Sequence, residues 1–310
     1  MKKCLVTGGC GFIGSNLCDY LLLKKHRVLI VDDLSTGHKS NLSSIFDKIE
    51  FYKEKIEWFD FDKVSDIDAI VHLAAQPSVP LSITNFADSS SSNLLGTINV
   101  IDYCRVRKIP FIYASSSAVY GNLPLGDDES KKIDLLSPYA TDKYAMELYA
   151  NTAYKLYQLS SIGLRFFNVY GPRQDPNSPY SGVISIFADR ILEGREITIN
   201  GGHQTRDFVY VKDVVNTIYQ AITLVSKSVI CEVSNVLTGE SVTIDHLSNQ
   251  MMDIVGVDVN KTYQDLSMGD PEQSDGTVEK MVKLFSIEIR RFSKLREGLQ
   301  ETIQYIKSDE

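Results

Sequence analysis

Along the first half of the chain, short apolar runs rich in Val and Ile alternate with segments whose apolar residues recur at helical spacing. After the first run, Ile13, Leu17 and Leu21 stand at i, i+4 and i+8, on one face of a helix. Ser137 followed by Pro138 is typical of a helix start. Strands are predicted over residues 4–7, 27–33, 51–53, 69–75, 110–115 and 161–168, and helices over 93–107 and 138–159. This alternation predicts an α/β fold, a Rossmann-like doubly wound parallel sheet.

The second half of the chain lacks this alternation. Residues 171–182 hold three prolines and predict a long functional loop, after which short strands and helices follow in no regular order. We therefore expect a Rossmann domain over residues 1–170. Residues 171–310 are expected to form mainly a smaller substrate-binding lobe at the carboxyl edge of the sheet, with the chain able to cross back to the sheet.

Charge and composition exclude several classes of protein. The chain of 310 residues has a net charge of −8 and no block of Lys or Arg, so neither nucleic acid nor an anionic membrane is expected as a partner. No apolar run approaches the ~18 residues of a membrane span. The five cysteines form no CxxC pair and the five histidines are isolated, so we expect no metal site and reduced thiols in the cytoplasm.

A glycine-rich loop joins the first predicted strand to the first helix. Gly8, Gly11 and Gly14 allow a tight turn, close approach to a pyrophosphate and close packing of the helix on the sheet. Asp32 ends the next predicted strand, 18 residues after Gly14, where it can accept hydrogen bonds from both ribose hydroxyls and repel a 2′-phosphate. The domain over residues 1–170 is therefore expected to bind NAD, while Lys39 leaves NADP open as an alternative.

A tyrosine and a lysine one helical turn apart predict the chemistry. Tyr139 and Lys143 lie on the same helical face, 23 and 27 residues after Ser116. The lysine and a nicotinamide cation are together expected to lower the pKa of the tyrosine, so that it takes a hydroxyl proton while hydride leaves the same carbon. Ser116, with Ser117 as an alternative, ends a strand and can hold that hydroxyl. The pattern predicts redox chemistry on an alcohol.

Several motifs together resemble the extended short-chain dehydrogenase/reductase family, and most closely its nucleotide-sugar 4-epimerases. The resemblance is good up to residue 215 and loose beyond it. The motifs are TGGCGFIGSN (7–16), HLAAQ (72–76), NLLGT (93–97), SSSAVYG (115–121), SPYATDKYAME (137–147), RFFNVYGPRQDP (165–176) and RDFVYVKDVV (206–215).

The resemblance implies a role for individual residues. Ser116, Tyr139 and Lys143 would be catalytic. The cofactor-binding residues that it implies are Gly8, Gly11, Phe12, Ile13, Gly14, Asp32, Leu73, Ala74, Ala75, Gln76, Asn93, Tyr139 and Lys143. The substrate-binding residues that it implies are Ser78, Ser116, Ser117, Asn168, Val183, Arg206, Asp270 and Ser274, with Asn168 and Arg206 on the diphosphate and Val183 near the uracil.

The same resemblance implies an activity. It points to a homodimeric isomerase for polysaccharide biosynthesis that epimerises a UDP-sugar at C4 through a transient 4-keto intermediate, with NAD as cofactor. Ser117-Ala118 stands where sugar dehydratases carry an Asp-Glu pair, which argues against a 4,6-dehydratase. A non-catalytic NAD-binding sensor is a remote alternative, because such proteins typically lose the tyrosine or the lysine.

One position of the resemblance bears on the sugar. Ser274 falls where this family has either a tyrosine or a small residue, and a small side chain leaves room for a 2-acetamido group. We therefore expect UDP-N-acetylglucosamine and UDP-N-acetylgalactosamine as substrates, with UDP-glucose or UDP-glucuronate as the alternative. Ser267 departs from the family, which commonly has an arginine there that contacts the diphosphate.

Overall fold

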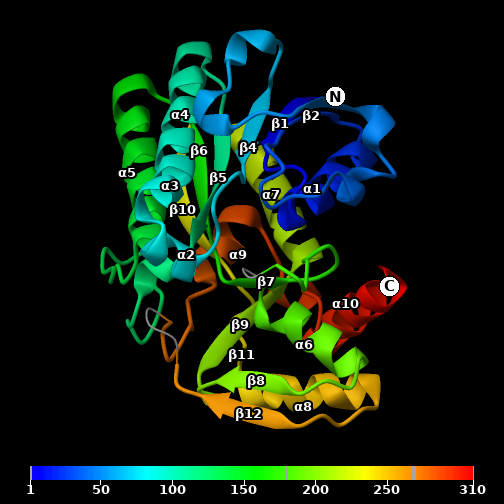
Figure 1. Ribbon diagram of the computed structural model, residues 1–310. Helices are drawn as coiled ribbons and strands as arrows, with labels where there is room; N and C mark the ends of the chain where they lie inside the picture. Colours follow the sequence, from blue (N-terminus) through cyan, green and yellow to red (C-terminus); the bar gives the residue numbers. More distant parts are fainter. Residues whose placement is uncertain (1, 179–180, 267–269, 310) are drawn as a thin grey trace. The chain divides into compact units, whose positions relative to one another are not determined.

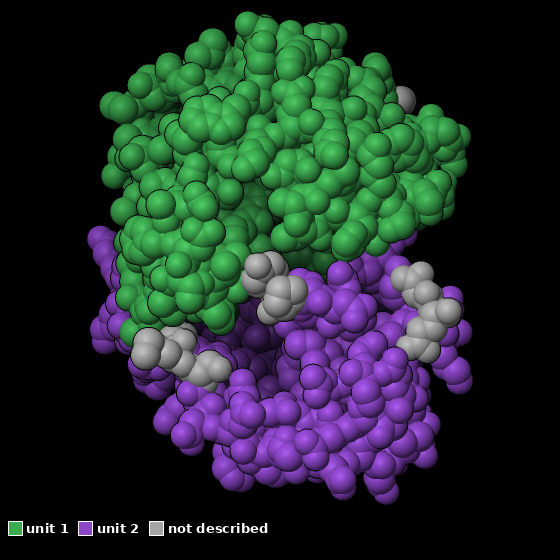
Figure 2. Space-filling view, viewed as in Figure 1, with its two compact units in different colours: residues 1–119, 135–165, 215–234 green, residues 120–134, 166–214, 235–310 purple. Residues whose placement is uncertain are grey.

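The computed structural model describes residues 2–178, 181–266 and 270–309, and the chain forms two compact units (Figure 2). Unit 1 comprises residues 1–119, 135–165 and 215–234; unit 2 comprises residues 120–134, 166–214 and 235–310. The boundary expected at residue 170 lies near the crossing between residues 165 and 166. In addition, residues 120–134 enter unit 2 earlier, and residues 215–234 return to unit 1.

Unit 1 is built on a seven-stranded parallel sheet with helices on both faces (Figure 1). In spatial order the strands are β10 (Cys231–Val236), β6 (Ser161–Phe166), β5 (Phe111–Ser116), β4 (Ala69–His72), β1 (Lys3–Thr7), β2 (Arg27–Val31) and β3 (Ile49–Tyr52). The strand order reverses between β1 and β4, and ligands of doubly wound sheets bind at the carboxyl ends beside such a reversal. The predicted fold class is confirmed.

The helices of unit 1 cover the two faces of this sheet (Figure 1). On one face lie α3 (Phe86–Ser90), α4 (Gly96–Arg107) and α5 (Pro138–Tyr157), and on the other lie α1 (Phe12–Leu23) and α7 (Val211–Val225). Because both faces are covered, the central strands are apolar almost throughout, and Leu5, Ile70 and Phe111 are fully buried. Leu17 and Leu21 of α1 are buried on the predicted helix face.

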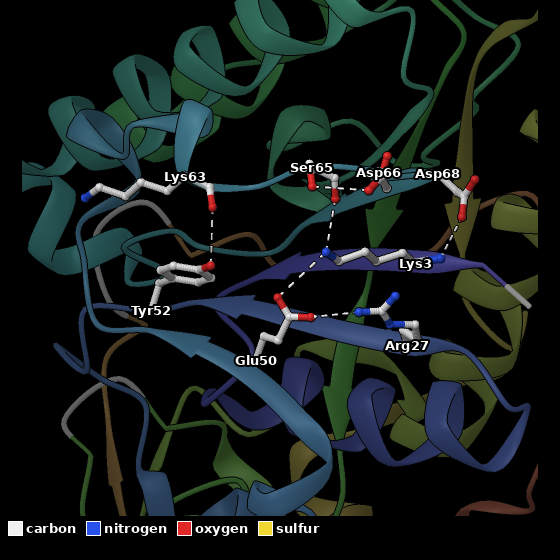
Figure 3. A network of polar contacts seen from close by, with 8 residues as sticks. All are labelled: Lys3, Arg27, Glu50, Tyr52, Lys63, Ser65, Asp66 and Asp68. Atoms are coloured by element: carbon white, nitrogen blue, oxygen red, sulfur yellow. Dashed lines mark hydrogen bonds and ion pairs between the residues drawn. The ribbon is translucent and has the colours of Figure 1, made fainter.

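A polar network ties the amino ends of the strands together, opposite the edge where ligands are expected (Figure 3). Lys3 Nζ donates to the Ser65 carbonyl at 3.0 Å and lies 3.7 Å from the Glu50 carboxylate. Arg27 meets the same carboxylate at 3.2 Å, and the Lys3 N–H donates to Asp68 at 2.7 Å. Such partly exposed ion pairs contribute only about 0–1 kcal/mol each, so this network orders the edge more than it stabilises the fold.

Unit 2 contains two small sheets and a group of packed helices. One sheet has the order β11-β9-β7, and the other pairs β12 with β8 in parallel. The elements are β7 (Asn168–Tyr170), α6 (Val183–Leu192), β8 (Ile197–Asn200), β9 (Thr205–Tyr210), β11 (Ser241–Thr243), α8 (Ile244–Val255), β12 (Lys261–Gln264), α9 (Glu279–Phe285) and α10 (Leu295–Asp309). Helix α10 packs on α6 and α8, and Tyr210 of β9 donates to Glu301 of α10 at 2.7 Å.

The strand predicted over residues 161–168 is divided in the structure. Strand β6 ends at Phe166, and the Phe167 N–H donates to the Val236 carbonyl at 3.1 Å. The chain then leaves the large sheet, and Asn168–Tyr170 pairs in parallel with β9 of unit 2. Strand β6 is buried throughout and β7 ends at the buried Tyr170, so the apolar pattern gives no sign of the break and periodicity alone could not reveal it.

Candidate active site

The loop after β1 is a turn whose glycines have no room for a side chain. Gly8 has a φ of +70°, and a Cβ there would lie 2.7 Å from the Ala74 nitrogen. A Cβ at Gly14 would lie 2.1 Å from the Gly8 oxygen. All residues of this turn are described. Gly11 is the N-cap of α1 and offers no side-chain hydrogen bond to the N–H groups of the first helical turn. That turn has no acidic residue. The N–H groups and the positive end of the helix dipole therefore suit a pyrophosphate.

Asp32 directly follows β2 and lies beside the glycine loop. Its carboxylate accepts the Cys10 N–H of that loop at 2.8 Å. Burial raises the pKa of Asp32, and hydrogen bonds from backbone N–H groups partly oppose this effect. Lys39, which left NADP open, lies with its Nζ 5.2 and 4.9 Å from the ring centres of Phe46 and Phe51. Aromatic faces thus flank the Lys39 ammonium, which is the cation that left NADP open.

The remaining cofactor candidates and the substrate candidate Ser78 also belong to unit 1. Asn93 lies in a π-helical turn, Ser91–Leu95, directly before α4, and such turns are frequent at functional sites. Its side chain accepts the Gln76 N–H at 2.8 Å and donates to the Gln76 carbonyl at 3.2 Å. Ser78 caps helix α2 (Val79–Thr84) by accepting the Leu81 N–H at 3.1 Å. The candidates at the start of α1 and after β4 are Phe12, Ile13, Leu73, Ala74 and Ala75.

A chain of hydrogen bonds through the buried His72 joins the end of β1, which precedes the glycine loop, to the π-helical turn that holds Asn93. Thr97 Oγ1 donates to the Asn93 carbonyl at 2.7 Å, so it accepts from His72 Nε2 at 3.0 Å. His72 Nδ1 then accepts from Thr7 Oγ1 at 2.8 Å. Thr7 in turn accepts the Ala74 N–H at 3.1 Å. This pattern assigns a neutral His72 with its proton on Nε2.

The stability of the protein should depend on pH through His72. Burial, with a smaller effect of Lys143, lowers the pKa of His72 from 6.5 to about 3. Below pH 6.5, His72 binds a proton in the unfolded chain but not in the folded protein. Stability is therefore lost as the pH falls from 6.5 towards 3. We expect His72 to contribute a loss of about 2 kcal/mol between pH 7 and pH 5, so that the stability of the wild type should fall by that much more than the stability of His72→Gln. Urea unfolding of both proteins at pH 7 and pH 5 measures this difference. Equal losses of stability in the two proteins would contradict the assignment of a neutral His72.

Helix α5 begins as the sequence predicts. Ser137 Oγ accepts the Ala140 N–H at 3.1 Å, and Pro138 occupies the first helical position. The Tyr139 N–H donates to Ser82 Oγ of α2 at 3.1 Å. The first turn of α5 is therefore fixed both by its own cap and by a neighbouring helix.

The three expected catalytic residues meet at the carboxyl end of β5. Ser116, the last residue of the strand, lies near enough to the Tyr139 phenol to lower its pKa. Lys143 Nζ donates to the Ala114 carbonyl at 2.8 Å and lies 5.6 Å from the centre of the Tyr139 ring. Ser117, the alternative to Ser116, begins the following 3₁₀ turn. An alcohol oxygen placed between Ser116 and Tyr139 could exchange its proton with the phenol.

The pKa of Tyr139 differs from the expectation. Burial raises the pKa of Tyr139, and Ser116 lowers it less. Burial also lowers the pKa of Lys143 to about 8, so the ammonium remains the main form at neutral pH. The sequence led us to expect a lowered tyrosine pKa once the lysine and a nicotinamide cation are both present. The protein groups alone do not produce it, because desolvation of the phenolate dominates.

The substrate candidates of unit 2 surround β7 and β9. Arg206 of β9 is buried, and its guanidinium pairs with the Asp270 carboxylate at 2.7 Å. Asn168 of β7 donates to the Asp207 carbonyl at 3.2 Å. Val183 is the first residue of α6. The structure thus brings Arg206 and Asp270 together, and the parallel pairing of β7 with β9 places Asn168 opposite Phe208, two residues after Arg206.

Ser274 is partly buried in a segment that is held on both sides. Two residues before Ser274, the Glu272 carbonyl accepts the Thr205 N–H at 3.1 Å. After it, the Gly126 N–H donates to the Asp275 carbonyl at 2.8 Å, and the Gly126 carbonyl accepts from Thr277 at 3.0 Å. Backbone hydrogen bonds on both sides of residue 274 therefore restrain the position of this segment. Ser267, the other position singled out in the sequence, lies outside the described residues.

Two features of the described residues bear on metal and membrane binding. These residues contain no group of three or more His, Cys, Asp or Glu side chains arranged to hold a metal ion. Nor do they include a helix long and apolar enough to span a bilayer. Among the described residues, Cys4, Cys10, Cys18, Cys104 and Cys231 form no disulfide bond.

Sequence reasoning missed two groups of residues that support the site. His72, Thr7 and Thr97 are far apart along the chain, and only the resemblance marked the segment around His72. Glu147, four residues after Lys143, forms a buried ion pair with Arg165. Its helical spacing was a usable signal, because residues four apart share a face.

The chain is similar to known proteins in sequence and in fold. The model of the NAD dependent epimerase/dehydratase family matches residues 4–236. The UDP-glucose 4-epimerase of Mycolicibacterium smegmatis is 34% identical over 319 residues, which cover 99% of each chain.

Two solved structures extend this similarity to the whole fold. The UDP-N-acetylglucosamine 4-epimerase of Methanobrevibacter ruminantium M1, in complex with UDP-N-acetylmuramic acid, has a TM-score of 0.92 and 35% identity, covering 100% of this chain and 99% of that one. The UDP-glucuronic acid 4-epimerase of Bacillus cereus, in complex with UDP-glucuronic acid and NAD, has a TM-score of 0.91 and 30% identity, covering 99% and 100%. The resemblance seen in the sequence is confirmed, and NAD is the cofactor. The chain belongs to the NAD dependent epimerase/dehydratase family.

Proposed function

We propose that the protein is a UDP-sugar 4-epimerase that acts mainly on UDP-N-acetylglucosamine and UDP-N-acetylgalactosamine. The observation that carries the proposal is the meeting of Tyr139, Ser116 and Lys143 at the carboxyl end of β5, in the same unit as the glycine loop. Relatives named as 4-epimerases of UDP-glucose, UDP-N-acetylglucosamine and UDP-glucuronic acid support the reaction type.

The residues of unit 1 supply the proton chemistry. Gly8, Gly11 and Gly14 hold the pyrophosphate of NAD, and Asp32 holds its ribose. When bound, NAD would supply reversible hydride chemistry at C4 of the sugar with no net redox change. Its positive charge would also favour the phenolate, which the protein groups alone do not achieve. Tyr139 removes the proton of the 4-hydroxyl and later gives it back, while Ser116 holds that oxygen.

Inversion requires that the 4-keto sugar turn over before the hydride returns to its other face. The UDP must therefore be held firmly and the sugar loosely. Arg206 and Asn168 are assigned to the diphosphate, Val183 to the uracil, and Ser78 and Ser117 to further contacts with the sugar nucleotide. Asp270, paired with Arg206, would orient that guanidinium.

A panel of UDP-sugars tests the proposal directly. Purified protein with no added NAD should interconvert UDP-N-acetylglucosamine and UDP-N-acetylgalactosamine faster than it epimerises UDP-glucose or UDP-glucuronate. Preferred turnover of either of the last two would favour the alternative substrate. Bound NAD without turnover of any sugar would favour the non-catalytic sensor.

Ser274 is expected to determine tolerance of the acetamido group. Ser274→Tyr should lower kcat/KM for UDP-N-acetylglucosamine by about 30-fold, because the ring fills the space of that group. The value for UDP-glucose should fall by less than about threefold. The control Ser274→Ala keeps the space open and should preserve both activities. Equal losses on both sugars in the tyrosine variant would contradict the role assigned to this position.

The expected homodimer remains a proposal. Helix α5 exposes Leu148, Tyr149, Leu156 and Tyr157, with exposed fractions from 39% to 66%. An apolar patch of this kind on one helix is typical of an interaction surface, and a second copy of the chain could bury it around a two-fold axis. Sedimentation equilibrium of the purified protein measures its mass, and a monomer at micromolar concentration would contradict the proposal.

A further inference from the structure

A buried ion pair lies one helical turn beyond Lys143, outside the residues assigned to catalysis. The Glu147 carboxylate accepts two hydrogen bonds from Arg165 of β6, from Nε at 2.8 Å and from Nη2 at 2.7 Å. It accepts a third from Ser115 Oγ of β5 at 2.6 Å. The exposed fractions of Glu147, Arg165 and Ser115 are 7%, 5% and 2%, so the whole group is removed from water.

Stability alone is a weak reason for such a group. Removing two charges from water opposes their attraction, and apolar side chains of similar volume often serve an interior equally well. A bidentate guanidinium–carboxylate contact does supply a defined geometry, because both N–H···O bonds form in only one relative orientation of the two groups. The third bond, from Ser115, extends this constraint from β6 to β5.

The geometry that is constrained is the placement of α5 on β5. Tyr139, Lys143 and Glu147 occupy three successive turns of α5 on one face. Each contacts one of three consecutive residues of β5. Tyr139 lies near enough to Ser116 for the serine to lower its pKa, Lys143 donates to the Ala114 carbonyl, and Glu147 accepts from Ser115. The first two contacts belong to the catalytic group, and the third lies beyond it on the same two elements.

We propose that Glu147, held by Arg165 and Ser115, is a positioning residue that sets the register of helix α5 on strand β5 and thereby keeps Tyr139 in reach of Ser116. The inference rests on the proposed function for its kinetic consequence. Its structural consequence, a fixed first half of α5, does not depend on which substrate the protein uses.

Ser115 is the position at which to test this inference. Removing Glu147 or Arg165 would leave the other charge buried without a partner, and such variants are expected to unfold. Ser115→Ala deletes one hydrogen bond and leaves the ion pair intact. Tyr113→Phe is the matched control, because it removes another buried hydroxyl of β5, one for which the described residues offer no hydrogen-bond partner.

The expected kinetic result is a selective loss of turnover. In the NAD-bound protein, Ser115→Ala should lower kcat for the UDP-sugar by about tenfold, since a small misplacement of a catalytic group is costly. KM and the amount of copurifying NAD should stay within about twofold, because neither ligand is assigned to Ser115. The pH at which kcat is half-maximal should rise, because Ser116 lowers the pKa of Tyr139. Ser115→Thr, which keeps a hydroxyl, should recover most of kcat, and Tyr113→Phe should match the wild type.

Hydrogen–deuterium exchange gives a readout that needs no turnover. Peptides covering residues 138–147 should exchange faster in Ser115→Ala than in Tyr113→Phe or the wild type. Unchanged kcat and unchanged exchange in Ser115→Ala would overturn the positioning role. Equal losses of kcat, KM and bound NAD would also overturn it, because they would indicate a general structural defect. An inactive wild type would overturn the proposed function, and the exchange result would then decide the positioning role.

Discussion

Tyr139→Phe is expected to lower epimerase turnover by about 10³-fold while the protein keeps its fold, its NAD and its affinity for UDP-sugars. The phenol is the only group of the Ser116–Tyr139–Lys143 cluster placed to take a hydroxyl proton, and general acid–base catalysis typically contributes 10²- to 10⁴-fold. The ring itself is retained, so packing at the start of α5 should not change. Turnover of UDP-N-acetylglucosamine and calorimetric binding of the same compound measure the two effects separately.

Tyr149→Phe is the control for this substitution. Tyr149 lies on the same helix but is 46% exposed, so loss of its hydroxyl should leave kcat within about twofold of the wild type. Near-normal turnover in Tyr139→Phe would show that the role assigned to the phenol is wrong. Loss of UDP-sugar binding together with turnover would show that Tyr139 serves binding instead of proton transfer.

The second large effect is expected for Gly14→Ala, which should remove copurifying NAD and destabilise unit 1. The added Cβ would lie 2.1 Å from the Gly8 oxygen and 2.8 Å from the Gly9 Cα. Both are backbone atoms of the loop, so relief requires that the turn itself move. Overpacking of this kind typically costs about 1–3 kcal/mol, and the displaced loop could no longer approach a pyrophosphate. Absorbance of released NAD and urea unfolding measure the two losses.

Gly194→Ala separates this collision from the general effect of replacing a glycine. Gly194 has a φ of +67° but nothing within 4 Å of the position of a Cβ. Its replacement should cost about 1 kcal/mol through backbone strain alone and should leave the bound NAD in place. If Gly14→Ala retained full NAD and the stability of the wild type, the glycine turn could not be the close-approach site that we describe.

The sequence was most informative where the relevant residues are close together along the chain. The cap at Ser137 and Pro138, the spacing of Tyr139 and Lys143, and the glycine turn are all local patterns, and the structure places each in the predicted element. The division of the strand over 161–168 was not predictable in the same way. Phe167 turns towards Val236, and only the pairing of β7 with β9 shows where the chain leaves the large sheet.

Taken alone, the sequence determined the doubly wound fold and the use of NAD, and it predicted the NAD site and the proton-transfer pair, because short-range periodicity and fixed spacing encode such patterns. Only the tertiary structure showed that burial raises the pKa of Tyr139 and that His72 is locked in its neutral form. The same holds for the contact of Glu147 with Arg165 and Ser115. Desolvation and such contacts arise when segments 18 to 65 residues apart pack together, and no local pattern records them.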